Sequence, residues 1–152
     1  MTEDHSGVVV VNPPATEGAK QDIPVFFGVS DRSAGARGIS LNLTAFPPGG
    51  NSKAHIHRQF ETAIFGVKGA CEIFYGERLE HSVVLKEGCF CFIPPSLPHK
   101  AYNLSESEQG LFVTARNDAN EQEDVVLTPE ADDASPDERV RETRRRYAAG
   151  EL

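Results

Sequence analysis

Three histidines and one glutamate are spaced in a way that can hold a metal ion. His55 and His57 are two residues apart, so on a strand both imidazoles point to the same face. Glu61 follows four residues after His57, and His99 comes later, after an apolar run and a proline-containing turn. Neutral imidazole and carboxylate ligands suit Fe, Mn, Ni, Zn or Cu and leave positions open for water or substrate. We therefore predict one divalent transition metal, with three histidine nitrogens and the Glu61 carboxylate as candidate ligands.

Neighbouring strands must bring these residues together, and the sequence predicts many short strands. Apolar and polar residues alternate over 39–44, which is typical of a half-buried strand. Val8 to Val11, four β-branched residues in a row, predict another strand near the N-terminus. Further apolar runs lie between turn residues at 23–29, 62–67, 71–75, 82–85, 89–93, 111–115 and 125–127. About nine short strands, with no helical period before position 130, predict an all-β sandwich or barrel.

The C-terminal segment has a different pattern. Ser135, Pro136 and Glu138 form a capping-box signal, and Gly150 can end the helix that follows. Val140 and Tyr147 give this helix only a thin apolar stripe, so we expect it to dock weakly, with its arginines solvated and salt-bridged. The expected organisation is an N-terminal arm with strands at 1–30, a barrel at 31–128 and a helical tail of mixed charge at 129–152.

Composition and charge exclude several functional classes. The 152 residues carry a net charge of −8, which disfavours nucleic-acid binding. The sequence contains no apolar run near the length of a membrane span, and its acidic first residues do not resemble a signal peptide. The three cysteines, Cys71, Cys89 and Cys91, are an odd number, which favours reduced thiols. We therefore expect a cytoplasmic protein without a membrane or nucleic-acid partner.

The segments around the candidate ligands resemble the two signature motifs of the cupin superfamily. The first motif comprises Gly49, His55, His57, Glu61 and Gly69, and the second comprises Gly88, Pro94, His99 and Asn103. The resemblance covers roughly residues 39–116. It implies a cupin-type antiparallel jelly-roll β-barrel, here followed by a short C-terminal α-helix, with the metal in the barrel lumen. It also implies that Asn103 has a structural role at the end of the motif.

Two departures from the motifs leave alternatives open. Ser96 replaces the glycine of the second motif, at a turn position. In the first motif, the distance from His57 to Gly69 fits the version that would place the glutamate at Thr62. Because one step along a strand reverses the face, Glu61 is either a ligand beside an irregular turn or points outward. In the second case the site is three histidines with open positions, or Gln59 supplies an oxygen.

The resemblance allows two classes of function. The first is a metal-dependent enzyme, dioxygenase-like or isomerase/cyclase-like, on a small organic substrate that is aromatic or carbonyl-containing. The aromatic-rich interior favours an aromatic or otherwise hydrophobic substrate. The second is a non-catalytic module that binds or senses a metal or small molecule. A sugar-phosphate isomerase is less favoured, because no basic cluster lies inside a motif. Lys53, Arg58, Lys100 and Arg116 are candidate anion contacts near the pocket mouth.

We also predict a homodimer. Sheet edges in a jelly roll need cover, and the apolar run from Val8 to Val11 is suited to pairing with the edge of another chain. Closed twofold dimers are the commonest oligomers.

Overall fold

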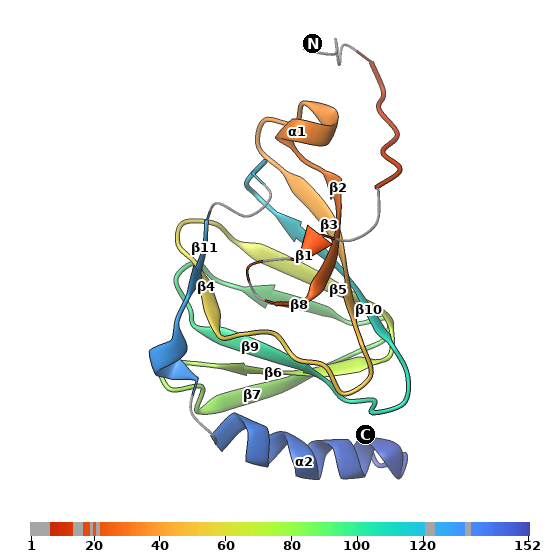
Figure 1. Ribbon diagram of the computed structural model, residues 1–152, viewed down its shortest axis with the longest axis vertical. Helices are drawn as coiled ribbons and strands as arrows, with labels where there is room; N and C mark the ends of the chain where they lie inside the picture. The colour runs from red at the N-terminus through yellow and green to blue at the C-terminus, as the bar shows by residue number, and fades with distance from the viewer. Residues whose placement is uncertain (1–6, 14–16, 19, 21, 121–123, 133–134) are drawn as a thin grey trace.

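Two antiparallel sheets face each other in the computed structural model, which describes residues 7–13, 17–18, 20, 22–120, 124–132 and 135–152 (Figure 1). The six-stranded sheet has the order β1 (Glu17–Gly18), β2 (Pro24–Val29), β3 (Ser40–Phe46), β10 (Gly110–Arg116), β5 (Thr62–Lys68) and β8 (Phe90–Ile93). The five-stranded sheet has the order β11 (Val125–Leu127), β4 (His55–His57), β9 (His99–Asn103), β6 (Ala70–Tyr75) and β7 (His81–Lys86). This is the predicted all-β jelly roll.

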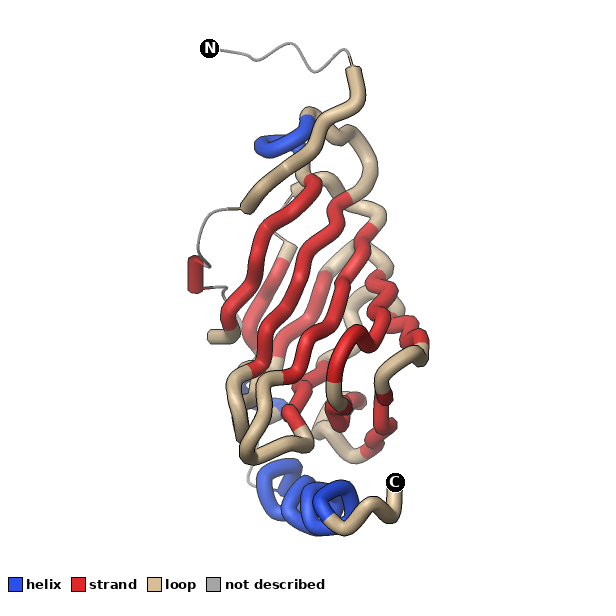
Figure 2. The backbone as a smooth tube through the Cα atoms, turned by 90° about the vertical axis from the view of Figure 1, so that its right-hand side faces the viewer, coloured by secondary structure: helices blue, strands red, loops and turns tan. Residues whose placement is uncertain are grey.

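Short helical elements complete the chain. They are α1 (Asp31–Ala34), the 3-10 turn η1 (Pro129–Ala131) and the C-terminal helix α2 (Ser135–Ala148). Figure 2 shows the strands of the larger sheet side by side, with α1 and α2 at opposite ends of the molecule. No helical pattern was read before position 130, but the polar segment 30–38 is an exception. It contains α1 because Ser30 forms a capping box with Ser33.

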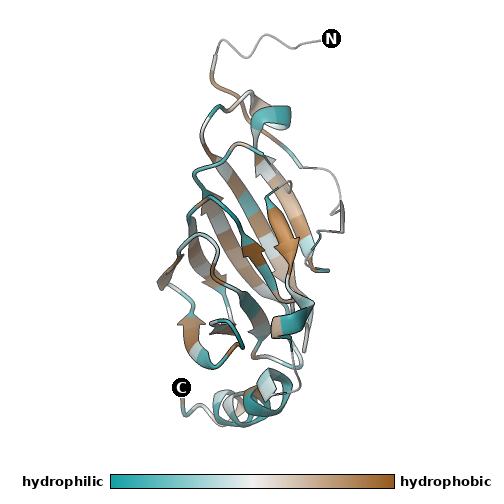
Figure 3. Ribbon diagram, turned by 90° about the vertical axis from the view of Figure 1, so that its left-hand side faces the viewer, coloured by the Kyte–Doolittle hydropathy of each residue, from teal (hydrophilic) through white to brown (hydrophobic). Residues whose placement is uncertain are grey.

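The main core lies between the sheets. Alternate residues of each strand point inward, so the apolar residues of period-two segments meet in the lumen. The buried members of this cluster are Ile23, Val25, Phe46, Cys71, Ile73, Leu85, Ile93 and Phe112. In Figure 3 the strands carry most of the hydrophobic colour, while α2 is mostly hydrophilic.

A second core lies under α2, on the outer face of the five-stranded sheet. It joins Phe74, Leu79, Leu104 and Val140, each at most 1% exposed. Burial of such a side chain stabilises a fold by about 1.5–3 kcal/mol. The expectation of a weakly docked helix was therefore wrong, because Val140 packs among these buried side chains, a contact that its sequence spacing does not reveal.

Arginine contacts add to the anchoring of α2. Arg144 donates from Nε to the Asn103 carbonyl and from Nη2 to the Gly49 carbonyl, each at 3.0 Å. Arg139 donates to the Leu79 carbonyl at 3.0 Å and lies over the Phe74 ring. The expectation of solvated, salt-bridged arginines holds for Arg145, which pairs with Glu142 on the exposed face, but it was wrong for Arg144, which donates to backbone carbonyls.

The N-terminal prediction of a strand at Val8–Val11 was wrong for the isolated chain. Residues 8–13 have no strand pairing, and the side chains of Val8 and Val10 are exposed. A strand is assigned only where a partner supplies backbone hydrogen bonds, and sequence propensity does not supply that partner.

Candidate metal centre

The three motif histidines come from two paired strands. His55 and His57 lie on β4, two residues apart and therefore on one face. His99 begins β9 and is paired in register with His55 across the ladder. Opposed side chains of an antiparallel pair lie on the same face of the sheet. The pairing of β4 with β9 thus brings together residues that are more than forty positions apart in the sequence.

The three imidazoles form a compact buried cluster. Each ring contributes one nitrogen to a group of atoms that all lie within 4.8 Å of one another. The ring centroids are 4.2 Å apart for His55 and His99, and 5.1 and 5.4 Å apart for the pairs that include His57. All three side chains are at most 5% exposed.

Backbone carbonyls fix two of the rings. The Nδ1 of His55 lies 2.8 Å from the Lys53 carbonyl oxygen, and the Nδ1 of His99 lies 2.8 Å from that of Leu97. Since a carbonyl only accepts, both Nδ1 atoms carry the proton and both Nε2 lone pairs are left for an ion. This is the usual outer contact of a metal-ligating histidine.

The loop before β9 is tied to the end of β4. Ser96 has φ 60°, the left-handed conformation that its motif position requires and that glycine adopts more easily. Its backbone N–H donates to the His57 carbonyl, and its hydroxyl donates to the Arg58 carbonyl, both at 2.7 Å. These bonds offset the strained conformation and explain why replacement of the glycine preserves the position of His99.

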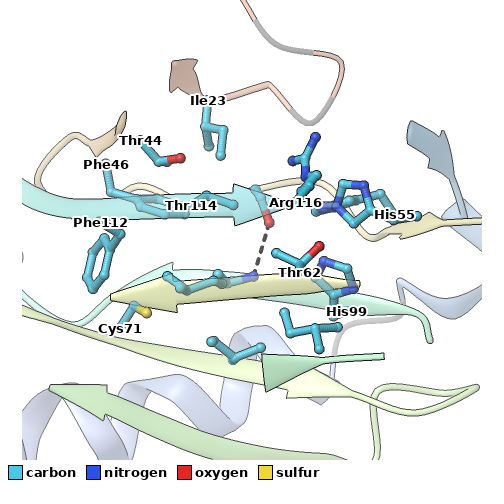
Figure 4. Close-up of a pocket in the computed structure, with 16 residues that line it drawn as sticks. Ile23, Thr44, Phe46, His55, Thr62, Cys71, His99, Phe112, Thr114 and Arg116 are labelled. Atoms are coloured by element: carbon cyan, nitrogen blue, oxygen red, sulfur yellow. Dashed lines mark hydrogen bonds between the residues drawn. The ribbon is translucent and has the colours of Figure 1, made fainter. Parts of the chain in front are cut away.

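A cavity of about 60 Å³ lies in the lumen beside the histidines (Figure 4). Phe46 and Phe112 make its apolar wall, with ring centroids 5.9 Å apart in an edge-to-face contact. Its polar lining comprises Thr44, Ser52, His55, His57, Thr62, His99, Thr114 and Arg116. The site therefore combines apolar side chains with polar groups that can orient a ligand, as small-molecule sites commonly do.

Electrostatics keep the imidazoles neutral. Burial lowers the pKa of His57 to about 2, helped by the positive charge of Arg116, and burial lowers the pKa of His99 to about 4. The pKa of His55 is also lowered well below its usual value, by burial and by the other two histidines. Neutral, buried and oriented imidazoles fit a divalent transition metal, because no proton must leave before it binds.

Glu61 lies outside this cluster. Its side chain is exposed, its backbone N–H donates to Asn117 Oδ1 at 2.8 Å, and Asn117 Nδ2 donates to Glu61 Oε2 at 3.1 Å. Gln59 is also exposed and does not line the cavity. Thr62, which follows Glu61 in the sequence, is buried and lines the cavity beside the histidines.

The candidate anion contacts are scattered. Lys53 and Arg58 are exposed, and Lys100 points to the opposite face of β9, where it pairs with Asp132 under α2. Only Arg116 of these four lines the cavity. Asn103 is fully buried, and its Nδ2 bridges the carbonyls of Pro47 and Glu108. Those bonds agree with a structural role.

A larger groove adjoins the site. It has a volume of about 490 Å³ and shares Ile73, Ile93 and His99 with the smaller cavity as lining residues. Phe90 and Phe92 on β8 are exposed and contribute to it, together with Tyr75. The cavity at the candidate metal centre and the aromatic groove are therefore direct neighbours with three lining residues in common.

The sequence of the barrel matches that of a known protein family. Residues 42–114 match the family model of the cupin domain. No curated protein matches the chain. None of the helices in the described part of the chain has the length and apolarity needed to cross a bilayer.

The fold is similar to that of several solved structures. An oxalate oxidase in complex with the substrate analogue glycolate has a TM-score of 0.65 at 21% identity, over 84% of this chain and 66% of that chain. An oxalate decarboxylase from Lactobacillus farciminis has a TM-score of 0.63 at 17% identity, over 79% and 34% of the two chains. An uncharacterised double-stranded β-helix protein from Klebsiella pneumoniae has a TM-score of 0.59 at 19% identity, over 84% and 96%. The chain thus spans just under two thirds of the oxalate oxidase, and the likeness concerns the fold.

Proposed function

Because the chain belongs to the cupin superfamily, we propose that it is a metal-dependent enzyme acting on a small organic substrate, with His55, His57 and His99 as metal ligands. The observation that carries this proposal is the convergence of three buried, neutral imidazoles on one cavity. Their burial is costly unless a ligand uses them. The proposed cofactor is one divalent transition metal among Fe, Mn, Ni, Zn and Cu.

The residues around the three histidines have distinct roles in this proposal. The Lys53 and Leu97 carbonyls hold the rings of His55 and His99 in the orientation that ligation requires. Phe46 and Phe112 keep bulk water from the enclosed end of the cavity, which strengthens polar interactions there. A bound divalent ion supplies Lewis-acid chemistry at a substrate oxygen or a binding position for O₂.

Glu61 is not among the ligands in this proposal. Its carboxylate is satisfied by Asn117, and the neighbouring position in the cavity belongs to Thr62. A hydroxyl is a weaker ligand than a carboxylate, so we propose a site of three histidines with its remaining positions open to substrate. The reaction classes that suit open positions are oxygenase-like or isomerase/cyclase-like chemistry.

The alternative is a module that binds or senses a small molecule without turnover. Two of the similar folds belong to enzymes by name, an oxidase and a decarboxylase, which favours the catalytic proposal over this alternative. The groove beside His99, whose lining includes Tyr75 and Phe92, offers room for an aromatic or otherwise apolar part of a substrate. We further propose a cytoplasmic location, in keeping with three free cysteines.

Turnover by the metal-loaded protein tests this proposal. The wild-type chain, reconstituted separately with Fe, Mn, Ni, Zn and Cu, is mixed with small aromatic and diketone compounds. O₂ uptake is followed with an electrode, and isomerised or cyclised products are followed by NMR. We expect turnover with at least one metal and none with His57→Ala. A wild-type protein that binds the metal and the compounds but converts none of them contradicts the enzyme and supports the binding module.

A further inference from the structure

Arg116 and Thr62 are direct neighbours across two strands of the larger sheet. Arg116 on β10 is paired in register with Thr62 on β5, and Thr114 is paired with Ile64. Opposed residues of antiparallel strands have side chains on one face, with Cβ atoms about 4.5–5.5 Å apart. All four residues line the cavity that also contains the three histidines (Figure 4). The register thus places a guanidinium and a hydroxyl beside the candidate metal ligands.

The Thr62 hydroxyl has no protein partner in the described chain. The side chain is 2% exposed, and its Oγ1 makes no hydrogen bond. Buried hydroxyls in native proteins are nearly always satisfied, so an unsatisfied one that faces a cavity indicates a ligand that accepts or donates there.

The charge of the cavity is one-sided. Among the described residues that line it, Arg116 is cationic and none is acidic. Burial lowers the pKa of Arg116 to about 10, while Asp118 and Asp124, which do not line the cavity, raise it. The guanidinium therefore stays protonated at neutral pH. Three neutral imidazoles add no negative charge. A divalent ion bound by them would keep its full charge, and together with Arg116 it would favour an anion in the cavity.

We infer that the cavity selects small carboxylate anions, with Arg116 as the anion-recognising residue and the Thr62 hydroxyl as a second hydrogen-bond donor. Guanidinium and carboxylate match each other in a planar, two-point contact. The inference rests on the proposed function, and it adds the chemical class of the ligand and the residues that bind it. The cavity of about 60 Å³ has room for a compact carboxylate such as formate or acetate.

Ligand titration of the cobalt-loaded protein tests the inference without any activity assay. Bound cobalt(II) absorbs in the visible range, and the bands shift when a ligand enters its surroundings. The probes are acetate and its neutral isostere acetamide. We expect acetate to bind at least about ten-fold more tightly than acetamide, because only acetate is a charged partner for Arg116.

Variants distinguish direct recognition of acetate by Arg116 and Thr62 from the general electrostatic attraction of the protein's positive charges. Arg116→Gln is expected to weaken acetate binding about ten-fold or more at unchanged cobalt stoichiometry, Arg116→Lys to weaken it less, and Thr62→Val to weaken it several-fold. Arg58→Gln removes the same charge from an exposed position next to the ligands and is expected to change the affinity less than about two-fold. Thermal unfolding of each variant checks that the fold is retained.

Two results overturn the inference. One is equal affinity for acetate and acetamide, and the other is acetate binding that Arg116→Gln leaves unchanged. A wild-type protein that takes up no cobalt contradicts the proposed metal site instead. In that case calorimetric titration of the metal-free protein with acetate decides the anion site alone: binding that is lost in Arg116→Gln supports it, and no binding overturns it.

Discussion

Glu61 and Thr62 are adjacent in the sequence, yet one side chain is exposed and the other is buried in the lumen. The turn after β4 determines which of them faces the histidines, since β5 begins at Thr62 and successive strand residues alternate between faces. The sequence alone left both possibilities open, because motif spacing counts residues and not the path of an irregular turn. The histidines were easier to predict, since two residues on one strand must share a face.

The first prediction concerns these two positions. Glu61→Ala is expected to leave the metal affinity within about two-fold, because the carboxylate is bonded to Asn117 and lies outside the cluster. His57→Ala is expected to weaken binding by about 100-fold or more, since two nitrogens hold a metal poorly. Competition with a chelator gives both affinities. Ten-fold weakening in Glu61→Ala would show that Glu61 is a ligand.

The second prediction concerns pH and the metal-free protein. The pKa values of His57 and His99 are about 2 and about 4 in the folded chain, below the value of an exposed imidazole. Below pH about 6.5 the unfolded chain therefore binds protons that the folded chain does not, and stability falls as the pH drops. The loss is about 1.4 kcal/mol per pH unit for each such histidine until the folded pKa is reached.

Urea denaturation between pH 7.5 and pH 4.5 measures this slope. His99→Gln is expected to reduce the slope. A free energy of unfolding that stays constant or rises as the pH drops to 4.5 would contradict the burial of neutral imidazoles.

Among the elements, one alternating segment and several short apolar runs between turn residues predicted most strands, and the exceptions have physical causes. β9, with the sequence HKAYN, shows no apolar alternation, because its outward residues Lys100 and Tyr102 are buried under α2. Figure 1 shows α2 across that end of the molecule. β4 is only three residues long, which is too short for a pattern to be read. Such strands depend on tertiary contacts with distant segments, and the local sequence carries no sign of those contacts.

The third prediction concerns the docking of α2. Arg144→Ala is expected to lower the free energy of unfolding by about 1.5–3 kcal/mol, because it leaves the carbonyls of Asn103 and Gly49 without their charged donor. Arg145→Ala removes an equal charge on the exposed face of the same helix and is expected to leave the stability almost unchanged. Urea denaturation followed by circular dichroism compares them. Equal effects would show that α2 is held by its apolar contacts alone.

At the scale of the whole molecule, two exposed apolar surfaces bear on assembly. Val8 and Val10 lie on an unpaired N-terminal segment, and Phe90 and Phe92 lie on β8, at the edge of the larger sheet. Free strand edges and exposed aromatic side chains favour association with another chain. Both features support the prediction of a homodimer with the N-terminal segments in the interface.

The fourth prediction is that the full chain is a dimer at micromolar concentration. Light scattering coupled to gel filtration gives the mass directly. Val8→Asp combined with Val10→Asp is expected to yield monomers without loss of fold, because both side chains are exposed within one chain, and deletion of residues 1–14 is expected to yield monomers or insoluble protein. A monomeric wild-type chain would contradict the prediction.

The central claim is that His55, His57 and His99 together hold one divalent metal. A crystal structure of the protein grown with zinc, with data collected on both sides of the zinc absorption edge, locates the ion by its anomalous signal. We expect a single peak in the lumen, about 2.0–2.1 Å from one nitrogen of each histidine, with Glu61 still bonded to Asn117. A lumen without a peak, or a peak coordinated by fewer than these three histidines, would show that these residues do not form the metal site.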